Sequence, residues 1–196
     1  MRIRGPVLVD TVPEISSHQG RIFQTYIKPG EVIHWPVDAV SKNGTFILNI
    51  PGKPDGTIDS EEKAIVESIG KWMQTNGEAI YATRPWKTFG EGPNSVKLGS
   101  FAGPSTASLD AKDIRFTRNK RGDVVYAIFL GWPMGKKFHI KSLGTASQFN
   151  PGKVAHVELP GCVDKLEWNQ LAESLTVEKP LVKPCDFAYA LKARLS

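Results

Sequence analysis

The second half of the chain is a series of short apolar runs, and this feature constrains its fold most strongly. From residue 90 onward, Gly, Pro, Asn and Asp separate these runs. Successive runs begin about 8 to 12 residues apart, which is typical of an antiparallel β-sandwich. The runs richest in aliphatic and aromatic residues, 124–129 and 187–191, should be central strands. The predicted strands are 114–118, 124–129, 137–143, 154–159, 165–170, 175–178 and 187–193.

A different pattern precedes this region, with one strand followed by one helix. Residues 45–50 (TFILNI) are apolar without polar alternation, which indicates a strand buried on both faces of a parallel sheet. An Asp-x-x-Glu capping pair then opens a helix over 59–77. The apolar stripe of this helix consists of Ile65, Ile69, Trp72 and Met73. Because one strand cannot satisfy its own backbone groups, either residues 1–30 supply a partner strand or the unit belongs to a larger α/β domain.

Composition excludes several classes of protein. The chain has 196 residues, of which 40% are hydrophobic and 23% charged, so it is neither a disordered tail nor a coiled coil. It contains no run of about 18 apolar residues, so we expect no membrane partner. The apolar run before Asp10 is too short for a convincing signal peptide, and the localisation stays open.

The net charge of +5 is diffuse except for one basic cluster. That cluster consists of Arg115, Arg118, Lys120 and Arg121. It could bind a phosphate backbone, but no interleaved aromatic residues accompany it. The segment RNKRGD is ordinary turn chemistry, so a basic hairpin tip is the favoured interpretation and we expect no nucleic-acid partner.

Metal and cofactor sites find little support in the sequence. Cys162 and Cys185 form no CxxC motif and are expected to be reduced thiols. The four histidines show no spacing that suits a metal ion, so we expect neither a metal nor another cofactor. They are His18, His34, His139 and His156.

Several motifs occur in a fixed order along residues 31–193. They are VSKNG at 40–44, ILNI at 47–50, DGTI at 55–58, NGEAIY at 76–81, TRPW at 83–86, FGEGP at 89–93, DIRFT at 113–117, YA at 126–127, LGWP at 130–133, IKSLG at 140–144 and KPCDFAY at 183–189. In this order and spacing they resemble the C-terminal part of retaining α-L-fucosidases, a glycoside hydrolase family.

The resemblance implies an α+β fold. Residues 1–90 would form an N-terminal α/β remnant of a (β/α)8 (TIM) barrel, and residues 91–196 a C-terminal antiparallel β-sandwich. One departure lies inside the matched region, where Trp35-Pro36 is expected to interrupt a helix that the family carries without a break. With most of the barrel missing, the apolar stripe on 59–77 would be exposed and would favour self-association or docking of a missing barrel fragment.

The resemblance also implies an activity, the hydrolysis of terminal α-L-fucosyl linkages in fucosylated glycans with retention of configuration. That reaction needs two carboxyl groups about 5 to 5.5 Å apart, a nucleophile and an acid/base. In the family both come from segments upstream of every motif matched here. We therefore assign no catalytic, substrate-binding or metal-binding residue, and we expect the isolated chain to be inactive. The alternative is a non-catalytic carbohydrate-binding or structural β-sandwich module.

Individual residues were weighed against these two functions. Asp10 and Glu14 are the only early carboxylates that could be imagined as a catalytic pair, but surface turn positions suit them better. At the end of the 45–50 strand, a place in a sugar pocket and a turn role are equally plausible; the residues there are Asn49, Pro51 and Lys53. Trp86 and Trp132 could stack on a sugar, but their Gly and Pro neighbours favour packing at the barrel–sandwich junction and the sandwich edge.

Overall fold

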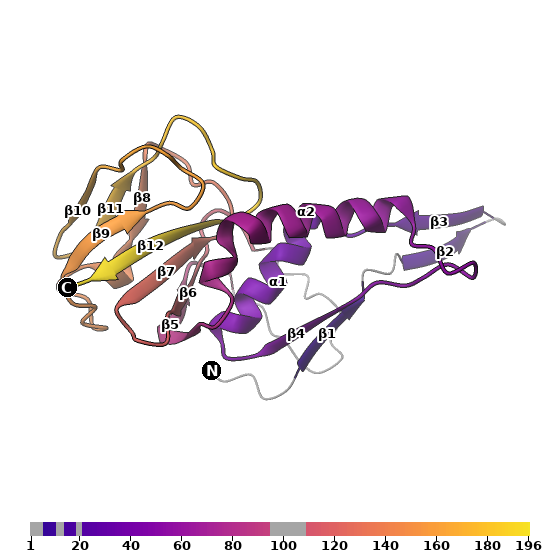
Figure 1. Cartoon of the computed structure of the whole chain (residues 1–196), viewed down its shortest axis with the longest axis horizontal. Helices are drawn as coiled ribbons and strands as arrows, with labels where there is room; N and C mark the ends of the chain where they lie inside the picture. The colour runs from indigo at the N-terminus through magenta and orange to yellow at the C-terminus, as the bar shows by residue number, and fades with distance from the viewer. Residues whose placement is uncertain (1–5, 11–13, 19–20, 95–108) are drawn as a thin grey trace.

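The computed structural model describes residues 6–10, 14–18, 21–94 and 109–196. Two antiparallel sheets form one end of an elongated molecule, and two helices and a small parallel sheet form the other (Figure 1). The larger sheet has the order β5 (Arg84–Glu91), β6 (Ile114–Arg118), β7 (Val124–Phe129), β12 (Tyr189–Leu195) and β9 (Val154–Glu158). The smaller sheet has the order β10 (Trp168–Gln170), β11 (Leu175–Glu178) and β8 (Lys137–Ile140), and the short 3-10 helix η2 (Lys141–Leu143) follows β8. The predicted antiparallel β-sandwich is confirmed.

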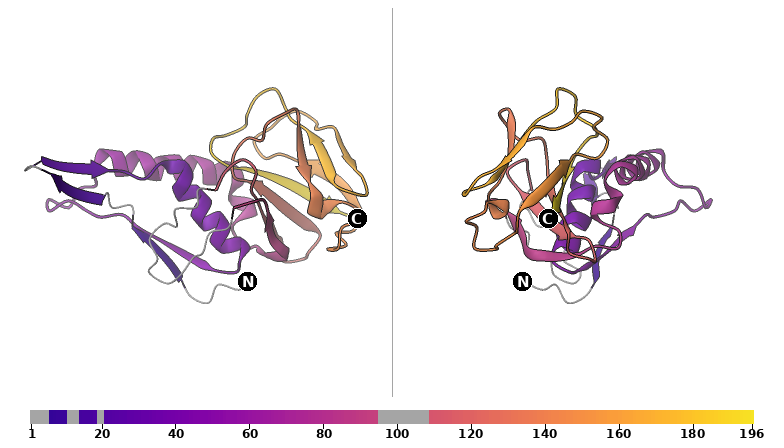
Figure 2. Two further views of the ribbon diagram at one scale, coloured as in Figure 1. Left: turned by 180° about the vertical axis from the view of Figure 1, so that it is seen from behind. Right: turned by 60° about the vertical axis from the view of Figure 1, so that its left-hand side comes forward.

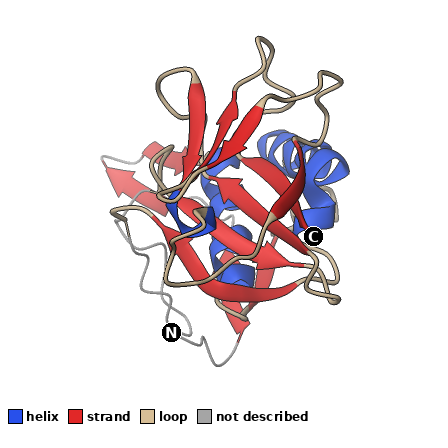
Figure 3. Ribbon diagram, turned by 90° about the vertical axis from the view of Figure 1, so that its left-hand side faces the viewer, coloured by secondary structure: helices blue, strands red, loops and turns tan. Residues whose placement is uncertain are grey.

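A continuous apolar core lies between the two sheets. Figure 3 shows these sheets from the sandwich end, with the helices behind them. Phe116 of β6, Phe138 of β8 and Val177 of β11 are fully buried in it. Burial of each such side chain contributes roughly 1.5–3 kcal/mol. The sandwich core is therefore a main source of the stability of the fold.

Two helices cover the outer face of the larger sheet (Figure 2). They are α1 (Pro29–Ser41) and α2 (Ser60–Asn76), and the 3-10 helix η1 (Gly77–Ala79) continues α2. Trp72 of α2 is buried against Ile128 of β7, and its Nε1 donates to the carbonyl oxygen of Ala188 at 2.8 Å. The apolar face of α2 is thus seated on the sandwich and on α1.

A small parallel sheet lies in the N-terminal half of the chain. β4 (Thr45–Asn49) pairs with β1 (Pro6–Asp10) over five residues, so residues 1–30 supply a partner strand, which was one of the two alternatives left open by the sequence. β2 (Glu14–His18) and β3 (Arg21–Thr25) form an antiparallel hairpin near the N-terminal end of α2 (Figures 1 and 2). Phe46 and Leu48 of β4 pack against a small cluster on α1 and α2.

One expectation for this part is wrong, and another concerns a complete parallel sheet. Burial of β4 on both faces is expected where strands and helices surround it; here its residues alternate between exposed and half-buried, and Ile47 is 46% exposed. No other described strand flanks it, and no described layer covers its outer face. The apolar stripe of α2 is in turn not exposed, because Ile65 packs against α1 and Trp72 against the sandwich.

Two element boundaries also differ from expectation. Helix α1 continues through Pro36 instead of stopping there. A proline inside a helix loses one hydrogen bond, but Val32, Ile33 and Val37 are buried around it and hold the helix on the sheet and on α2. β5, which was not predicted as a strand, pairs with β6 and begins at Arg84, before the expected domain boundary at 90/91.

Candidate functional site

The C-terminal edge of the β1–β4 sheet is the first candidate site. Both strands are parallel, so both end at the same edge, and Asp10 is the register partner of Asn49. In a barrel this edge faces the active site. Side chains of residues 6–25 lie outside the described part, so the predicted turn role of Asp10 and Glu14 stays a prediction.

A tight turn follows β4. The backbone N–H of Lys53 donates to the Thr57 carbonyl at 2.7 Å. Asp55 Oδ1 accepts from the backbone N–H of Thr57 at 2.9 Å and from its hydroxyl at 2.7 Å. These bonds hold the pKa of Asp55 below its usual value of 3.8. Asp55 therefore shapes the turn as an ionised acceptor.

Asp59 is the centre of a small polar cluster at the start of α2. Its Oδ1 accepts from the backbone N–H of Glu61 and from the Tyr26 hydroxyl, each at 2.9 Å. Its Oδ2 lies 3.3 Å from Lys53 Nζ. The bond from Glu61, followed by that from Tyr26, lowers the pKa of Asp59. Lost hydration, together with this carboxylate, raises the pKa of Tyr26 to about 12. The predicted capping role of the Asp-x-x-Glu pair is confirmed for Asp59.

A retaining glycosidase needs a general acid as well as a nucleophile. Such an acid must be protonated at working pH, which requires a raised pKa. Where a carboxyl group of the described residues has a resolved shift, its pKa is lowered; these groups are Asp55, Asp59, Glu78 and Asp123. The described carboxylates of this edge, Asp55 and Asp59, are engaged in the turn after β4 and in the cap of α2.

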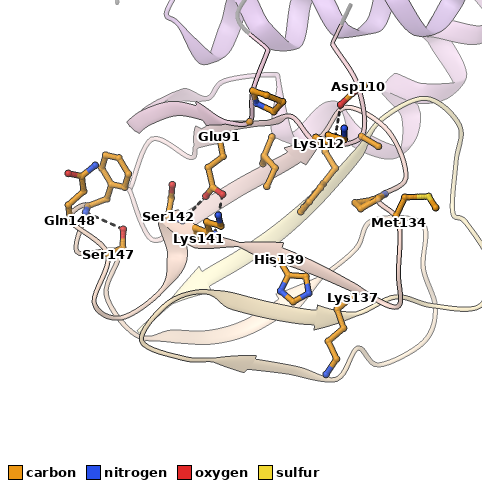
Figure 4. A pocket seen from close by; sticks show the side chains of 17 residues that line it. Glu91, Asp110, Lys112, Met134, Lys137, His139, Lys141, Ser142, Ser147 and Gln148 are labelled. Carbon is orange, nitrogen blue, oxygen red and sulfur yellow. Dashed lines mark hydrogen bonds between the residues drawn. The ribbon is translucent and has the colours of Figure 1, made fainter.

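The second candidate is an open hollow of about 950 Å³ at the rim of the sandwich (Figure 4). Ile114, Phe129 and Phe149 give it an apolar floor. Glu91 points into it but accepts from the backbone N–H groups of Lys141 at 3.1 Å and Ser142 at 2.6 Å. Its carboxylate thus stabilises the start of η2.

Trp86 and Trp132, the two tryptophans that could have stacked on a sugar, both pack into the sandwich. Trp86 is 8% exposed and lies against Phe116 and Phe149, with ring centroids 5.1 and 5.9 Å apart. Trp132 lies at the rim, edge-on to Tyr189 at 4.7 Å. Both rings therefore pack against other side chains, as predicted. Trp86, however, lies in the sandwich core and not at the barrel–sandwich junction, where it was expected.

The remaining sequence candidates are scattered. His18, His34, His139 and His156 lie on four different elements, and the described residues include no group of side chains suited to a metal ion. Cys162 and Cys185 are free thiols. No helix of the described part is long and apolar enough to cross a membrane.

The basic cluster separates into two parts. Arg118, Lys120 and Arg121 lie at the turn between β6 and β7, as a hairpin tip predicts. Arg115 is instead buried and forms an ion pair with Asp38 of α1 at 2.6 Å.

Sequence reasoning missed this ion pair. Asp38 also pairs with Lys42, one helical turn later, at 2.6 Å. A usable signal existed, because Asp38 stands inside an otherwise apolar run with a lysine four residues on. Carboxylates in such runs are rarely buried without a cation.

Comparison with known proteins supports the resemblance found in the sequence. The model of the Alpha-L-fucosidase family matches residues 13–78, and that of the Alpha-L-fucosidase C-terminal domain matches residues 109–194. Tissue alpha-L-fucosidase of Mus musculus is 32% identical over 173 residues, which cover 86% of this chain and 33% of that protein. The human tissue enzyme is 30% identical over 167 residues, covering 83% of this chain and 30% of that protein.

A solved structure supports the same conclusion at the level of fold. The α-fucosidase of Thermotoga maritima, in complex with a mechanism-based inhibitor, superposes with a TM-score of 0.69 at 22% identity, over 96% of this chain and 39% of that chain. The chain spans about a third of the length of the curated relatives it matches. The two family models match in sequence order, one over the barrel remnant and one over the sandwich. The chain therefore belongs to the α-L-fucosidase family, of which it represents the C-terminal part.

Proposed function

We propose that this chain acts as the C-terminal part of a retaining α-L-fucosidase and that, alone, it does not hydrolyse α-L-fucosides. The observation that carries this proposal is the extent of the match, about a third of the relatives' length. The state of β4 supports it, since this strand has one described neighbour where a barrel strand has two.

The chemistry supports the proposal as well. Retaining hydrolysis needs a nucleophile that forms a glycosyl-enzyme and an acid that protonates the leaving oxygen. Its cap bonds hold the pKa of Asp59 below its usual value, and Glu91 accepts from the backbone N–H groups at the start of η2. Both therefore serve structure. The fucosylated glycan is then the substrate of an assembled enzyme, and neither nucleic acid nor a membrane is proposed as a partner.

Within that enzyme the chain would have two parts, a barrel remnant over 1–90 and a sandwich over 91–196. β5 joins them, because it pairs with β6 of the sandwich and contacts α1 of the remnant. The open edge of β4 is the place where the rest of a barrel would pair. The proposed partner of this edge is therefore a barrel fragment or, in its place, a second copy of this chain.

The test is turnover of 4-nitrophenyl α-L-fucoside by the purified chain, alone and co-expressed with the upstream two thirds of a full-length relative. We expect background rates for the chain alone and fucoside hydrolysis for the co-expressed pair. Turnover by the chain alone that is lost in Asp10→Asn or Glu14→Gln would overturn the proposal. An upstream fragment that is equally active without this chain would show that the pair does not assemble one site.

A groove of about 580 Å³ supports the alternative function, a non-catalytic carbohydrate-binding module. Trp168 lines it beside the polar side chains of Thr145, Asn150 and Asn169. An aromatic surface with a few polar groups is typical of small-molecule sites. A carbohydrate-binding module would bind immobilised fucose without turnover and lose binding in Trp168→Ala, whereas the fucosidase proposal expects no such retention by the chain alone.

A further inference from the structure

A basic hollow lies at the opposite end of β4 from Asn49, and the functions discussed so far leave it unused. It has a volume of about 520 Å³ and lies between the C-terminal end of α1, strand β5 and the end of β6. Its lining includes Arg84, Lys87 and Arg118 together with half-buried Phe89 and Phe149 and the largely buried Trp86. None of its described lining residues is acidic.

The hollow exists because β5 bows away from its neighbour. Arg84 and Pro85 pair with Arg118 and Thr117, and pairing resumes only at Gly90 with Arg115. Residues 86–89 therefore arch out of the ladder, and their side chains form one wall. Such irregularities often mark places where a strand presents side chains to a ligand.

Arg84 and Arg118 are direct cross-strand partners on this wall. Like charges directly opposite each other destabilise a sheet. Arg84 donates to the Thr83 carbonyl at 2.8 Å, and Arg118 to the Asn119 carbonyl at 3.2 Å. Neither forms an ion pair with any described residue. Two guanidinium groups of five donors each thus line the same hollow without a counter-charge in the described structure.

Lys87 adds a third cation, which is fixed in place. Its Nζ donates to the Asn150 carbonyl at 2.7 Å and forms no ion pair with a described residue. Lys42, which also lines the hollow, is already paired with Asp38 and adds little to its free charge. The free positive charge of the hollow therefore comes from Arg84, Lys87 and Arg118.

We propose that this hollow binds an anionic saccharide unit, with its sulfate or carboxylate group between Arg84 and Arg118 and its ring against an aromatic wall formed by the half-buried Phe89 and Phe149. Guanidinium groups match the geometry of such oxyanions and bind them through paired N–H donors. An aromatic wall with a few convergent polar groups is what a sugar ring requires beside them. The proposal concerns binding alone and does not depend on the fucosidase function.

The test is calorimetric titration of the chain with a sulfated disaccharide, a uronate-containing disaccharide, a neutral disaccharide and inorganic sulfate. We expect saturable binding of at least one anionic disaccharide, at least about tenfold tighter than that of inorganic sulfate, and none of the neutral sugar. Preference for the sulfated or the uronate sugar identifies the oxyanion. Equal binding of inorganic sulfate, or no binding of either anionic sugar, overturns the proposal.

Variants locate the site. The double variant Arg84→Gln/Arg118→Gln should weaken binding by about tenfold or more, since it removes both forks. Arg121→Gln is the matched control, because Arg121 lies on the same hairpin, pairs with Asp123 and does not line the hollow. Arg84→Lys, which keeps the charge but loses the fork, should fall between the two. An equal loss in Arg121→Gln, or no loss in the double variant with its circular dichroism unchanged, contradicts the proposal.

Discussion

Asp38 of α1 and Arg115 of β6 are joined by a buried ion pair, with 2.6 Å between Oδ1 and Nε and both side chains about 1% exposed. The residues are 77 positions apart in sequence and come from the barrel remnant and the sandwich. Phe89 of β5 lies beside the pair, 5.6 Å from the Arg115 guanidinium carbon. The contact between the two parts of the molecule therefore combines a buried ion pair with the apolar cluster of α1, α2 and the larger sheet.

Replacing Asp38 by Asn should destabilise the fold by about 3–5 kcal/mol, because it leaves Arg115 and Lys42 buried without their carboxylate. Urea unfolding, followed by circular dichroism, measures this loss. Lys63→Gln is the control, since its pair with Glu67 is 3.9 Å long and exposed, and it should change stability by less than about 0.5 kcal/mol. A cost for Asp38→Asn as small as that of the control would contradict the role given to this pair.

Gly144→Ala should destabilise the sandwich. A Cβ there would lie 2.5 Å from the backbone oxygen of Ala172, and backbone yields little. Gly70→Ala should do the opposite, since nothing lies within 4 Å of its added Cβ and alanine favours the interior of α2 by about 1 kcal/mol. Melting temperatures of the two variants check both signs, and a stabilised Gly144→Ala protein would refute the steric argument.

Hydrogen exchange should be faster in β4 than in β7. β4 has one described neighbour and an outer face without a covering layer, whereas β7 lies between β6 and β12 and all its residues are buried. Opening β4 therefore breaks fewer contacts than opening β7. Mass-spectrometric exchange on peptides covering each strand makes the comparison, and equal, strong protection would contradict it.

Asp59 should contribute stability that acid removes. Its folded pKa is lowered from 3.8, chiefly by the backbone N–H of Glu61. Its contribution is thus fully present above that value and is lost as the pH falls through the lower folded pKa. The gap in melting temperature between the parent and Asp59→Ala should be constant above about pH 5 and shrink toward pH 2.5. Asp59→Asn, which can still cap α2, should show a smaller gap, and a gap independent of pH would sink this account.

The open edge of β4 should cause the chain to self-associate at micromolar concentration. Unpaired strand edges template pairing with other chains, and Ile47 beside this edge is 46% exposed. Ile47→Lys should lower the mass measured by light scattering. Leu181→Lys is the control, since Leu181 is fully exposed on a sandwich loop. A parent protein that stays monomeric over a wide concentration range would show that the edge does not pair with other chains.

The sandwich could be predicted from the sequence because its signals are local. Turn residues bound the runs 114–118, 124–129 and 175–178, and each became a strand with those limits. The fucosidase motifs added the identity of the domain. β5 was missed because Pro85 and Gly90 argue against a strand, and it forms only because β6 offers it a partner on either side of the bow.

The candidate sites were less accessible from the sequence. The hollow at Arg84 depends on a cross-strand partner 34 residues away, Arg118, and on a bow in β5 that no local pattern encodes. The Asp38–Arg115 pair likewise needs the register of α1 on β6. The expectation that Trp35-Pro36 interrupts a helix was wrong, because tertiary packing around α1 outweighs the local cost of Pro36.

Helix α2 forms a rigid connection between the two ends of the molecule. Its 17 residues make a rod about 25 Å long. One end is anchored on the sandwich, where the Asn76 side chain accepts from the backbone N–H of Ala190 at 3.2 Å, and the other carries the Asp59 cluster. A tilt of a few degrees at Asn76 moves Asp59 by about 1 Å, a displacement large enough to matter for catalytic alignment. The way the sandwich anchors Asn76 therefore determines where Asp59, at the other end of α2, lies relative to the edge of β4.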